Sequence, residues 1–166
     1  KNIADAKQVK FRIAEAAVNK LSYQAWGFNP VVMPWPDVPQ ALQTGVINGL
    51  DHTAIVCNIT KKFTIAKSFT QLNYAQGLFV HLVNKRWLDK LPEDLRATFL
   101  EVVAEESAAT REATRKQHDE QVAKAKEAGV EFFELPESEV AELKKMAEPV
   151  LEKWGEKIGP EYLATV

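Results

Sequence analysis

One segment, residues 92–128, restricts the possible folds of this chain more than any other. It contains no glycine, its only proline is its first residue, Pro92, and it is rich in alanine, glutamate, lysine and arginine. These residues favour a helix, and Gly129 is expected to end it. At a rise of about 1.5 Å per residue, such a helix reaches roughly 50 Å, more than the width of one small domain. We therefore expect a helix that lies across two bodies.

Strand patterns and helix patterns alternate before this helix. Val9–Ile13 alternates apolar and polar residues as a strand does, residues 14–26 have helical spacing, and Val31–Met33 is a second short apolar strand. A helical crossover of this length joins parallel strands, and parallel sheets need cover on both faces. The predicted fold class is therefore α/β.

Further elements are expected along the rest of the chain. Gly77–Asn84 is the longest strand candidate, because it is rich in β-branched and aromatic residues, and we expect it to be buried. The remaining predictions are a helix over 38–46 capped by Asp37, a helix through Cys57 to about residue 63, a strand over 130–133, and one or two helices over 137–157 with a break at Pro149.

The composition argues against several classes of protein. The net charge is −2 and charges of both signs are interspersed, so no basic face suits nucleic acid. The single cysteine, Cys57, excludes an internal disulfide framework and a cysteine-rich zinc site. No apolar run approaches the roughly 20 residues that span a bilayer, and the first residues lack the apolar stretch of a secretion signal. We therefore expect either a cytoplasmic chain or a signal that precedes residue 1.

Two side chains in or after the expected strands are candidates for holding a ligand. Arg12 lies in mid-strand, and its guanidinium is able to hold a carboxylate by two parallel hydrogen bonds. Strand alternation alone favours the alternative, an arginine in solvent or paired with Glu15. Trp35 lies at the carboxyl end of the second strand, where open α/β sheets place their ligands. A tryptophan that caps the core fits that pattern equally well.

A third candidate group consists of Asp51, His52 and Thr53, between a turn and the next helix. A hydroxyl, an imidazole and a helix amino terminus together suit an anion, and Asp51 is able to accept a hydroxyl or a cation. A simple helix cap at Asp51 or Thr53 explains the same residues at least as well. His81 and His118 are assigned no role.

Catalytic motifs are missing from the sequence. It has no Gly-x-Ser-x-Gly turn, phosphate-binding glycine loop, dinucleotide fingerprint or His-Glu-x-x-His helix. Cys57 lies five residues after His52, but a buried, unreactive thiol is the commoner explanation. We therefore predict a protein that is not an enzyme and that uses no cofactor and no metal. A hydrolase that uses Asp51 or His52 ranks last among the alternatives.

Several segments, taken in order, resemble the DctP-type solute-binding proteins of tripartite ATP-independent periplasmic (TRAP) transporters. The resemblance covers nearly the whole chain, and its most specific part is DVPQALQTGVING at residues 37–49. The other segments are ADAKQVKFRI at 4–13, NPVVMPW at 29–35, NKRWLDKLPEDLR at 84–96 and AGV at 128–130. It implies the carboxyl-terminal portion of a two-lobed α/β binding protein, with a long helix shared by both lobes.

The resemblance also implies a division of the chain. Residues 1–70 would form the ligand-binding region of the second lobe. Residues 71–111 would hold a strand and the helix start that belong to a first lobe outside this sequence. Residues 112–166 would comprise the end of the long helix, a strand and carboxyl-terminal helices that pack on the second lobe.

Residue roles are implied position by position. Arg12 matches the arginine that clamps the ligand carboxylate in this family, and Trp35 falls where an aromatic residue commonly lines the pocket. Asp51 and His52 occupy a segment that usually reads Gln-Glu-Asn-Pro, or that carries a metal-ligating acid followed by tryptophan. His52 and Thr53 depart from both patterns, so the particular acid is not specified.

The implied function is the capture of a small organic acid, a carboxylate, in the periplasm for the membrane subunits of a TRAP transporter. The signal peptide and the first lobe would lie outside this sequence. The strand over 77–84 would then lack its neighbours, and we expect self-association or strand swapping with a second copy. The alternative is a non-catalytic helical interaction or scaffold module, but the apolar spacing of the long helix ends after Glu105.

Overall fold

The structure is a computed structural model, which describes residues 2–75, 77–159 and 161. Its larger sheet is parallel throughout and has the strand order β2-β1-β3. The strands are β1 (Lys10–Ile13), β2 (Asn29–Val32) and β3 (Gly49–Leu50). The crossovers are α2 (Ala17–Ala25) between β1 and β2, and η1 (Trp35–Asp37) with α3 (Val38–Gln43) between β2 and β3. The predicted α/β class and the β-α-β unit are thus confirmed.

The register of this sheet brings three parts of the chain to one edge. Arg12 on the central strand pairs with Val31 of β2 and Leu50 of β3. Because all three strands run in the same direction, the residues that follow β2 and β3 emerge beside the end of β1. Gly49 opens β3 because a side chain there would collide with Val9 and Phe11. The candidate residues 12, 35 and 51–53 therefore come from neighbouring positions in space.

A second layer forms around a two-stranded parallel sheet of β4 (Ser68–Gln71) and β5 (Glu131–Glu134). The helix α4 (Ala54–Ile59) packs on the carboxyl-terminal end of α6 (Glu93–Glu127). Buried Cys57, Phe63 and Ala125 join these elements in one core. The short helices α1 (Ile3–Ala6), η2 (Lys62–Thr64) and α5 (Lys85–Leu88) complete the fold before the final helix.

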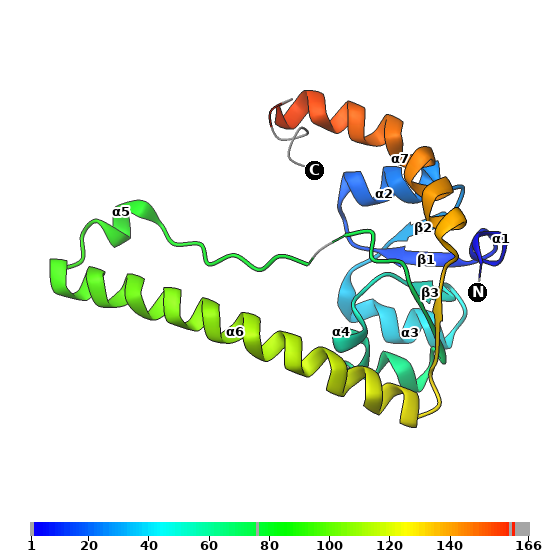
Figure 1. The fold of residues 1–166 in the computed structure, drawn as a ribbon, viewed down its shortest axis with the longest axis horizontal. Helices are drawn as coiled ribbons and strands as arrows, with labels where there is room; N and C mark the ends of the chain where they lie inside the picture. Colours follow the sequence, from blue (N-terminus) through cyan, green and yellow to red (C-terminus); the bar gives the residue numbers. More distant parts are fainter. Residues whose placement is uncertain (1, 76, 160, 162–166) are drawn as a thin grey trace.

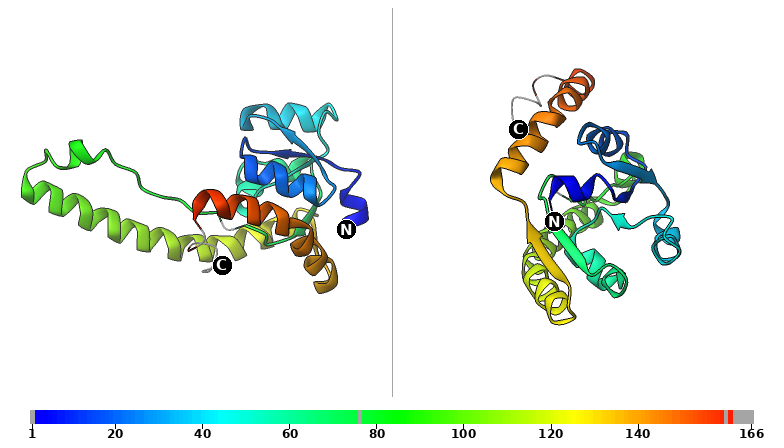
Figure 2. Two further views of the ribbon diagram at one scale, coloured as in Figure 1. Left: turned by 90° about the horizontal axis from the view of Figure 1, so that it is seen from above. Right: turned by 90° about the vertical axis from the view of Figure 1, so that its right-hand side faces the viewer.

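The final helix, α7 (Glu137–Ile158), covers α2. The indole nitrogen of Trp26, the residue directly after α2, donates a hydrogen bond of 2.8 Å to the backbone oxygen of Leu143 in α7. The expected break at Pro149 is not found: α7 is one helix with this proline inside it. Figures 1 and 2 show that the helix bends instead, as expected where a proline removes one backbone donor.

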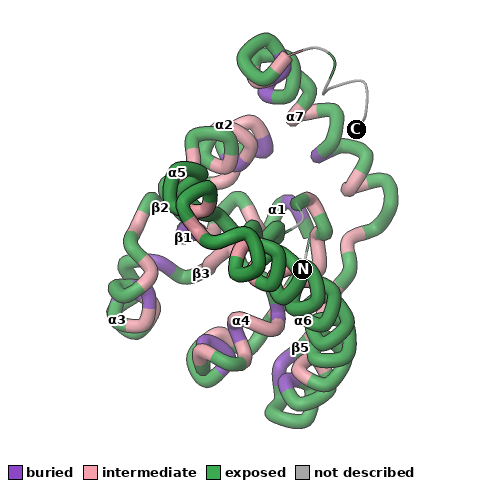
Figure 3. The backbone as a smooth tube through the Cα atoms, turned by 90° about the vertical axis from the view of Figure 1, so that its left-hand side faces the viewer, coloured by how far each residue is buried: buried purple, intermediate pink, exposed green. Residues whose placement is uncertain are grey.

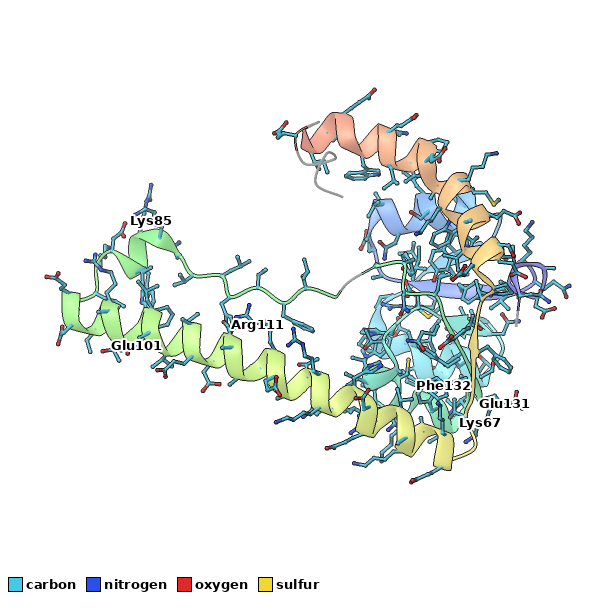
Figure 4. The ribbon with its side chains drawn as sticks, viewed as in Figure 1. Lys67, Lys85, Glu101, Arg111, Glu131 and Phe132 are labelled. Atoms are coloured by element: carbon cyan, nitrogen blue, oxygen red, sulfur yellow. The ribbon has the colours of Figure 1, made fainter. Side chains whose placement is uncertain are left out.

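The long helix is confirmed as α6, with 35 residues and within one residue of both predicted ends. Figure 1 shows that it projects far from the sheets and carries α5 near its distal end. Figure 3 shows this projecting part as almost entirely exposed, and Figure 4 places Glu101 and Arg111 on it. Only the carboxyl-terminal end of α6 has a buried residue, Ala125.

The prediction of a buried strand over Gly77–Asn84 is wrong for this structure. The segment is drawn out beside α6 without strand pairing (Figure 1), and all of its residues are exposed, with Phe79 96% exposed. The physical reason is that no described strand lies beside it to accept its backbone hydrogen bonds. The strand β3 was missed because it has only two residues, and β4 was missed because its sequence, SFTQ, has one apolar residue and no clear apolar alternation.

Candidate ligand-binding site

Arg12 is the centre of the candidate site. It is one of two charged residues in the described part of the chain that are buried, at 6% exposed. Its Nε donates a hydrogen bond of 2.9 Å to the backbone oxygen of Met33. The other N–H groups of the guanidinium have no partner among the described residues, and none of these nitrogens is a fully buried atom without a partner. The guanidinium of Arg12 is therefore held in place through Nε, and its terminal nitrogens keep some contact with solvent.

Two opposing effects act on the pKa of the Arg12 guanidinium. Burial lowers the pKa of the guanidinium, and the nearby negative charge of Asp51 acts in the opposite direction. An arginine stays protonated throughout the physiological range even when its pKa falls, because its ordinary value is so high. Arg12 thus offers a permanent positive charge beside the end of β1.

Trp35 lies against this guanidinium. Its ring centroid is 5.1 Å from Cζ of Arg12 and 5.0 Å from the centroid of the His52 ring. Pro34 and Pro36 on either side limit the backbone around it, so the indole forms a rigid wall. The half-buried Trp35 packs on the buried cluster of Val38, Ala41 and Ile47, as expected of a tryptophan that caps the core. Its role as a pocket wall stays a prediction.

Asp51 and His52 follow β3 and close the group. The backbone N–H of Asp51 donates to the backbone oxygen of Arg12 at 3.1 Å, and its carboxylate accepts a short hydrogen bond from the Tyr74 hydroxyl. The Nδ1 of His52 accepts a hydrogen bond of 2.9 Å from the backbone N–H of Thr53. This bond places the proton of neutral His52 on Nε2.

Thr53 serves the helix that follows it. Its hydroxyl oxygen accepts a hydrogen bond of 3.4 Å from the backbone N–H of Val56 and so caps α4. A helix cap was the alternative explanation that the sequence allowed for Asp51, His52 and Thr53, and Thr53 forms it. The side chain is exposed, and a role of Thr53 in binding stays a prediction.

Two members of the site were not predicted. Lys62 is 5% exposed, and its Nζ lies 4.7 Å from the ring centroid of Trp35. Tyr74 donates to Asp51, and burial, followed by this hydrogen bond and the charge of Asp51, raises the pKa of its hydroxyl. Neither residue stands in a recognisable motif, since Lys62 follows another lysine and Tyr74 comes from an irregular segment. We call Arg12, Trp35, Asp51, His52, Lys62 and Tyr74 the Arg12 cluster.

The reactive groups near the cluster are not arranged for catalysis. Burial raises the pKa of the Cys57 thiol to about 12, so that this thiol is protonated at neutral pH and is a poor nucleophile. Within residues 2–75, 77–159 and 161, no three His, Cys, Asp or Glu side chains gather as metal ligands would. The helices of the same described part include none with the length and apolar character to span a membrane.

The comparison with protein families accords with this arrangement. The family model described as the bacterial extracellular solute-binding protein, family 7, or DctP, matches residues 1–157. The chain therefore belongs to the DctP family of extracellular solute-binding proteins. The members of this family bind solutes and are not enzymes.

Curated relatives extend over most of this chain. The C4-dicarboxylate-binding periplasmic protein DctP of Rhodobacter capsulatus is 31% identical over 159 residues, which are 95% of this chain and 48% of the relative. The 2,3-diketo-L-gulonate-binding periplasmic protein YiaO of Escherichia coli is 26% identical over 133 residues, which are 80% of this chain and 40% of the relative. The chain thus spans about half the length of the curated relatives that it matches.

Solved structures share the fold. The sugar acid binding protein DctPAm of Advenella mimigardefordensis, in complex with galactonate, has a TM-score of 0.86 at 23% identity, over 96% of this chain and 52% of that protein. A TRAP solute-binding protein of Shewanella oneidensis with bound succinate has a TM-score of 0.83 at 23% identity, over 97% and 53%. These likenesses show that the chain has the TRAP solute-binding fold.

Proposed function

We propose that this chain is the ligand-binding part of an extracytoplasmic solute-binding subunit that captures a small organic acid for a TRAP-type secondary transporter. Arg12 fixes the carboxylate of the ligand, and Trp35, Asp51, His52 and Thr53 shape the selectivity for the rest of it. The observation that carries this proposal is the buried Arg12 guanidinium, anchored by Met33 through Nε, with its other N–H groups free of described protein partners.

The chemistry of the cluster supports an acid as the ligand. A guanidinium presents two parallel N–H groups that match the two oxygens of a carboxylate, and burial strengthens such a pair. The Trp35 indole gives the carbon part of the ligand an apolar surface, and His52 Nε2–H is an additional donor. The relatives and structural neighbours include binding proteins for a C4-dicarboxylate, 2,3-diketo-L-gulonate, galactonate and succinate.

The partners and the compartment follow from this proposal. The family and its relatives are extracellular or periplasmic proteins, so we place the protein in the periplasm. Its partners would be the membrane subunits of a TRAP transporter, which would recognise a form closed around the ligand by hinge motion. Self-association of the 166-residue chain through residues 77–84 is a separate part of the proposal, and its test is given in the Discussion.

A thermal-shift screen of organic acids on the full-length protein tests the function. A ligand at 100 times its dissociation constant stabilises the folded protein by about 2.7 kcal/mol, which raises the melting temperature measurably. We expect a shift with at least one carboxylate and none with the methyl ester or amide of the same compound, because a neutral group cannot form the ion pair. Equal shifts with the acid and its ester would contradict a carboxylate site.

A further inference from the structure

Lys62 is the second buried cation of the Arg12 cluster, and the proposed function does not yet use it. The residue is 5% exposed, and its one hydrogen bond among the described residues is a long one, 3.4 Å from Nζ to the backbone oxygen of Thr60. An ammonium group has three donors, and its removal from water is costly unless they and its charge are satisfied. The described residues around Lys62 therefore compensate its charge poorly.

The surroundings of Lys62 supply little negative charge. No aspartate or glutamate of the described residues forms an ion pair with it. Its main contact is the Trp35 indole, at 4.7 Å, and Arg12 lies 5.1 Å from the same ring centroid. The one carboxylate of the cluster, Asp51, accepts a hydrogen bond from Tyr74. The cluster thus holds two basic side chains, Arg12 and Lys62, and one carboxylate, Asp51.

The backbone shows that the fold places Lys62 in this position. Lys61 has a φ of 59°, in the left-handed region that residues with a side chain rarely adopt. This turn separates α4 from η2, leaves Lys61 exposed and directs Lys62 into the interior. Strained backbone persists only where the surrounding structure imposes it, so the burial of Lys62 is a specified feature of the fold.

We propose that Lys62 is a ligand-binding residue. Its ammonium has no carboxylate partner among the described residues, and the carboxylate of the bound acid compensates the charges of both Lys62 and Arg12. This inference rests on the proposed function. An acid held by Arg12 lies beside the same indole that Lys62 contacts, where little water screens the charges. Binding would then remove an electrostatic cost that the ligand-free protein carries, and this gain would add to the affinity.

Calorimetry on the full-length protein tests the affinity, with succinate, galactonate and galacturonate as probes. Lys62→Met keeps the apolar stem and removes the charge, Lys62→Arg keeps the charge, and Lys61→Met is the matched exposed control. For any probe that binds, we expect Lys62→Met to weaken binding about tenfold or more. We expect Lys62→Arg to restore most of the affinity and Lys61→Met to change it less than about twofold.

Thermal melting without ligand measures the stability of the same variants, and here Lys62→Met is expected to have a favourable effect although it weakens binding. Because an apolar group replaces a poorly compensated buried charge, Lys62→Met should raise the melting temperature of the ligand-free protein by a few degrees. A lower melting temperature with unchanged affinity would mean that Lys62 is only structural, and this would overturn the inference.

The Arg12→Lys variant separates the two proposals. If it weakens binding while Lys62→Met does not, the inference about Lys62 fails and the proposed function stands. If neither variant changes the affinity, or if no probe binds the unmodified protein, the proposed function fails and the inference fails with it.

Discussion

Arg12 has exchanged most of its hydration for one backbone acceptor, the oxygen of Met33, and for the face of Trp35. A guanidinium has five N–H donors, so this exchange leaves most of them to other partners. At the residue scale, the site is therefore a fixed cation with unused donors. Asp51 and His52 adjust its electrostatics, because the charge of Asp51 acts on the pKa of both Arg12 and His52.

The protonation of His52 is the first prediction at this scale. Burial, followed by the charge of Arg12, lowers the pKa of His52 below the ordinary 6.5, and Asp51 opposes them. A histidine with a lowered folded pKa is neutral in both states above pH 6.5. Below that value the unfolded chain takes up the proton first, so the contribution of His52 to stability is lost as the pH falls.

Nuclear magnetic resonance titration of the imidazole in the full-length protein measures this pKa. Asp51→Asn should lower the pKa of His52 further, because it removes the opposing negative charge, whereas Arg12→Met should raise it. A titration at or above 6.5, or one insensitive to both substitutions, would mean that His52 is not electrostatically coupled to the cluster.

Part of this arrangement was predictable from single residues and part was not. Arg12, Trp35, Asp51 and His52 were singled out because each lies at the end of a strand or inside one, and the parallel topology brings such positions together. Lys62 was missed because its burial depends on the left-handed turn at Lys61, a backbone feature that two adjacent lysines do not signal.

At the scale of elements, local composition predicted the helices well and the strands less well. The helix α6 was predicted to within one residue at each end because helix propensity and the stop at Gly129 are local properties. Strand formation depends on a neighbouring strand, so β3, with two residues, was missed and residues 77–84 were assigned wrongly. The single helix α7 was not predicted with certainty either, because a proline inside a helical pattern permits a bend as well as a break.

The contact between α2 and α7 gives the prediction at this scale. Trp26→Phe removes the indole donor to the Leu143 oxygen and should lower the free energy of unfolding by about 1–3 kcal/mol. Trp154→Phe in α7 is the matched control, because the indole nitrogen of Trp154 has no hydrogen-bond partner among the described residues. Urea unfolding of the full-length protein measures both variants. Equal losses would show that the hydrogen bond of Trp26 contributes nothing measurable.

At the scale of the whole molecule, the most unusual feature is the exposed projection formed by residues 77–84, α5 and most of α6 (Figures 1 and 3). Leu78, Phe79 and Leu82 are each more than four-fifths exposed, although soluble proteins seldom leave such a run uncovered. The chain spans about half of its curated relatives, and the division at residues 70/71 and 111/112 stays a prediction. We propose that this run pairs as a strand with a second copy when the 166-residue chain is isolated.

Light scattering on the 166-residue chain tests this self-association. Val80→Pro removes a backbone donor and should convert a dimer or larger assembly to monomer, whereas Val80→Thr keeps a β-branched residue and should leave the assembly intact. A monodisperse monomer for the unmodified chain would refute strand pairing. Equal assembly of both variants would indicate apolar clustering without backbone pairing.

The central claim is that the guanidinium at position 12 binds the carboxylate of a captured acid. Isothermal titration calorimetry of the full-length Arg12→Lys protein, with the acid that gives the largest thermal shift, tests it most directly. Lysine keeps the charge but cannot form the two parallel hydrogen bonds, so the account predicts an affinity that is several-fold weaker or worse. An unchanged affinity would show that Arg12 supports the fold and does not bind the ligand.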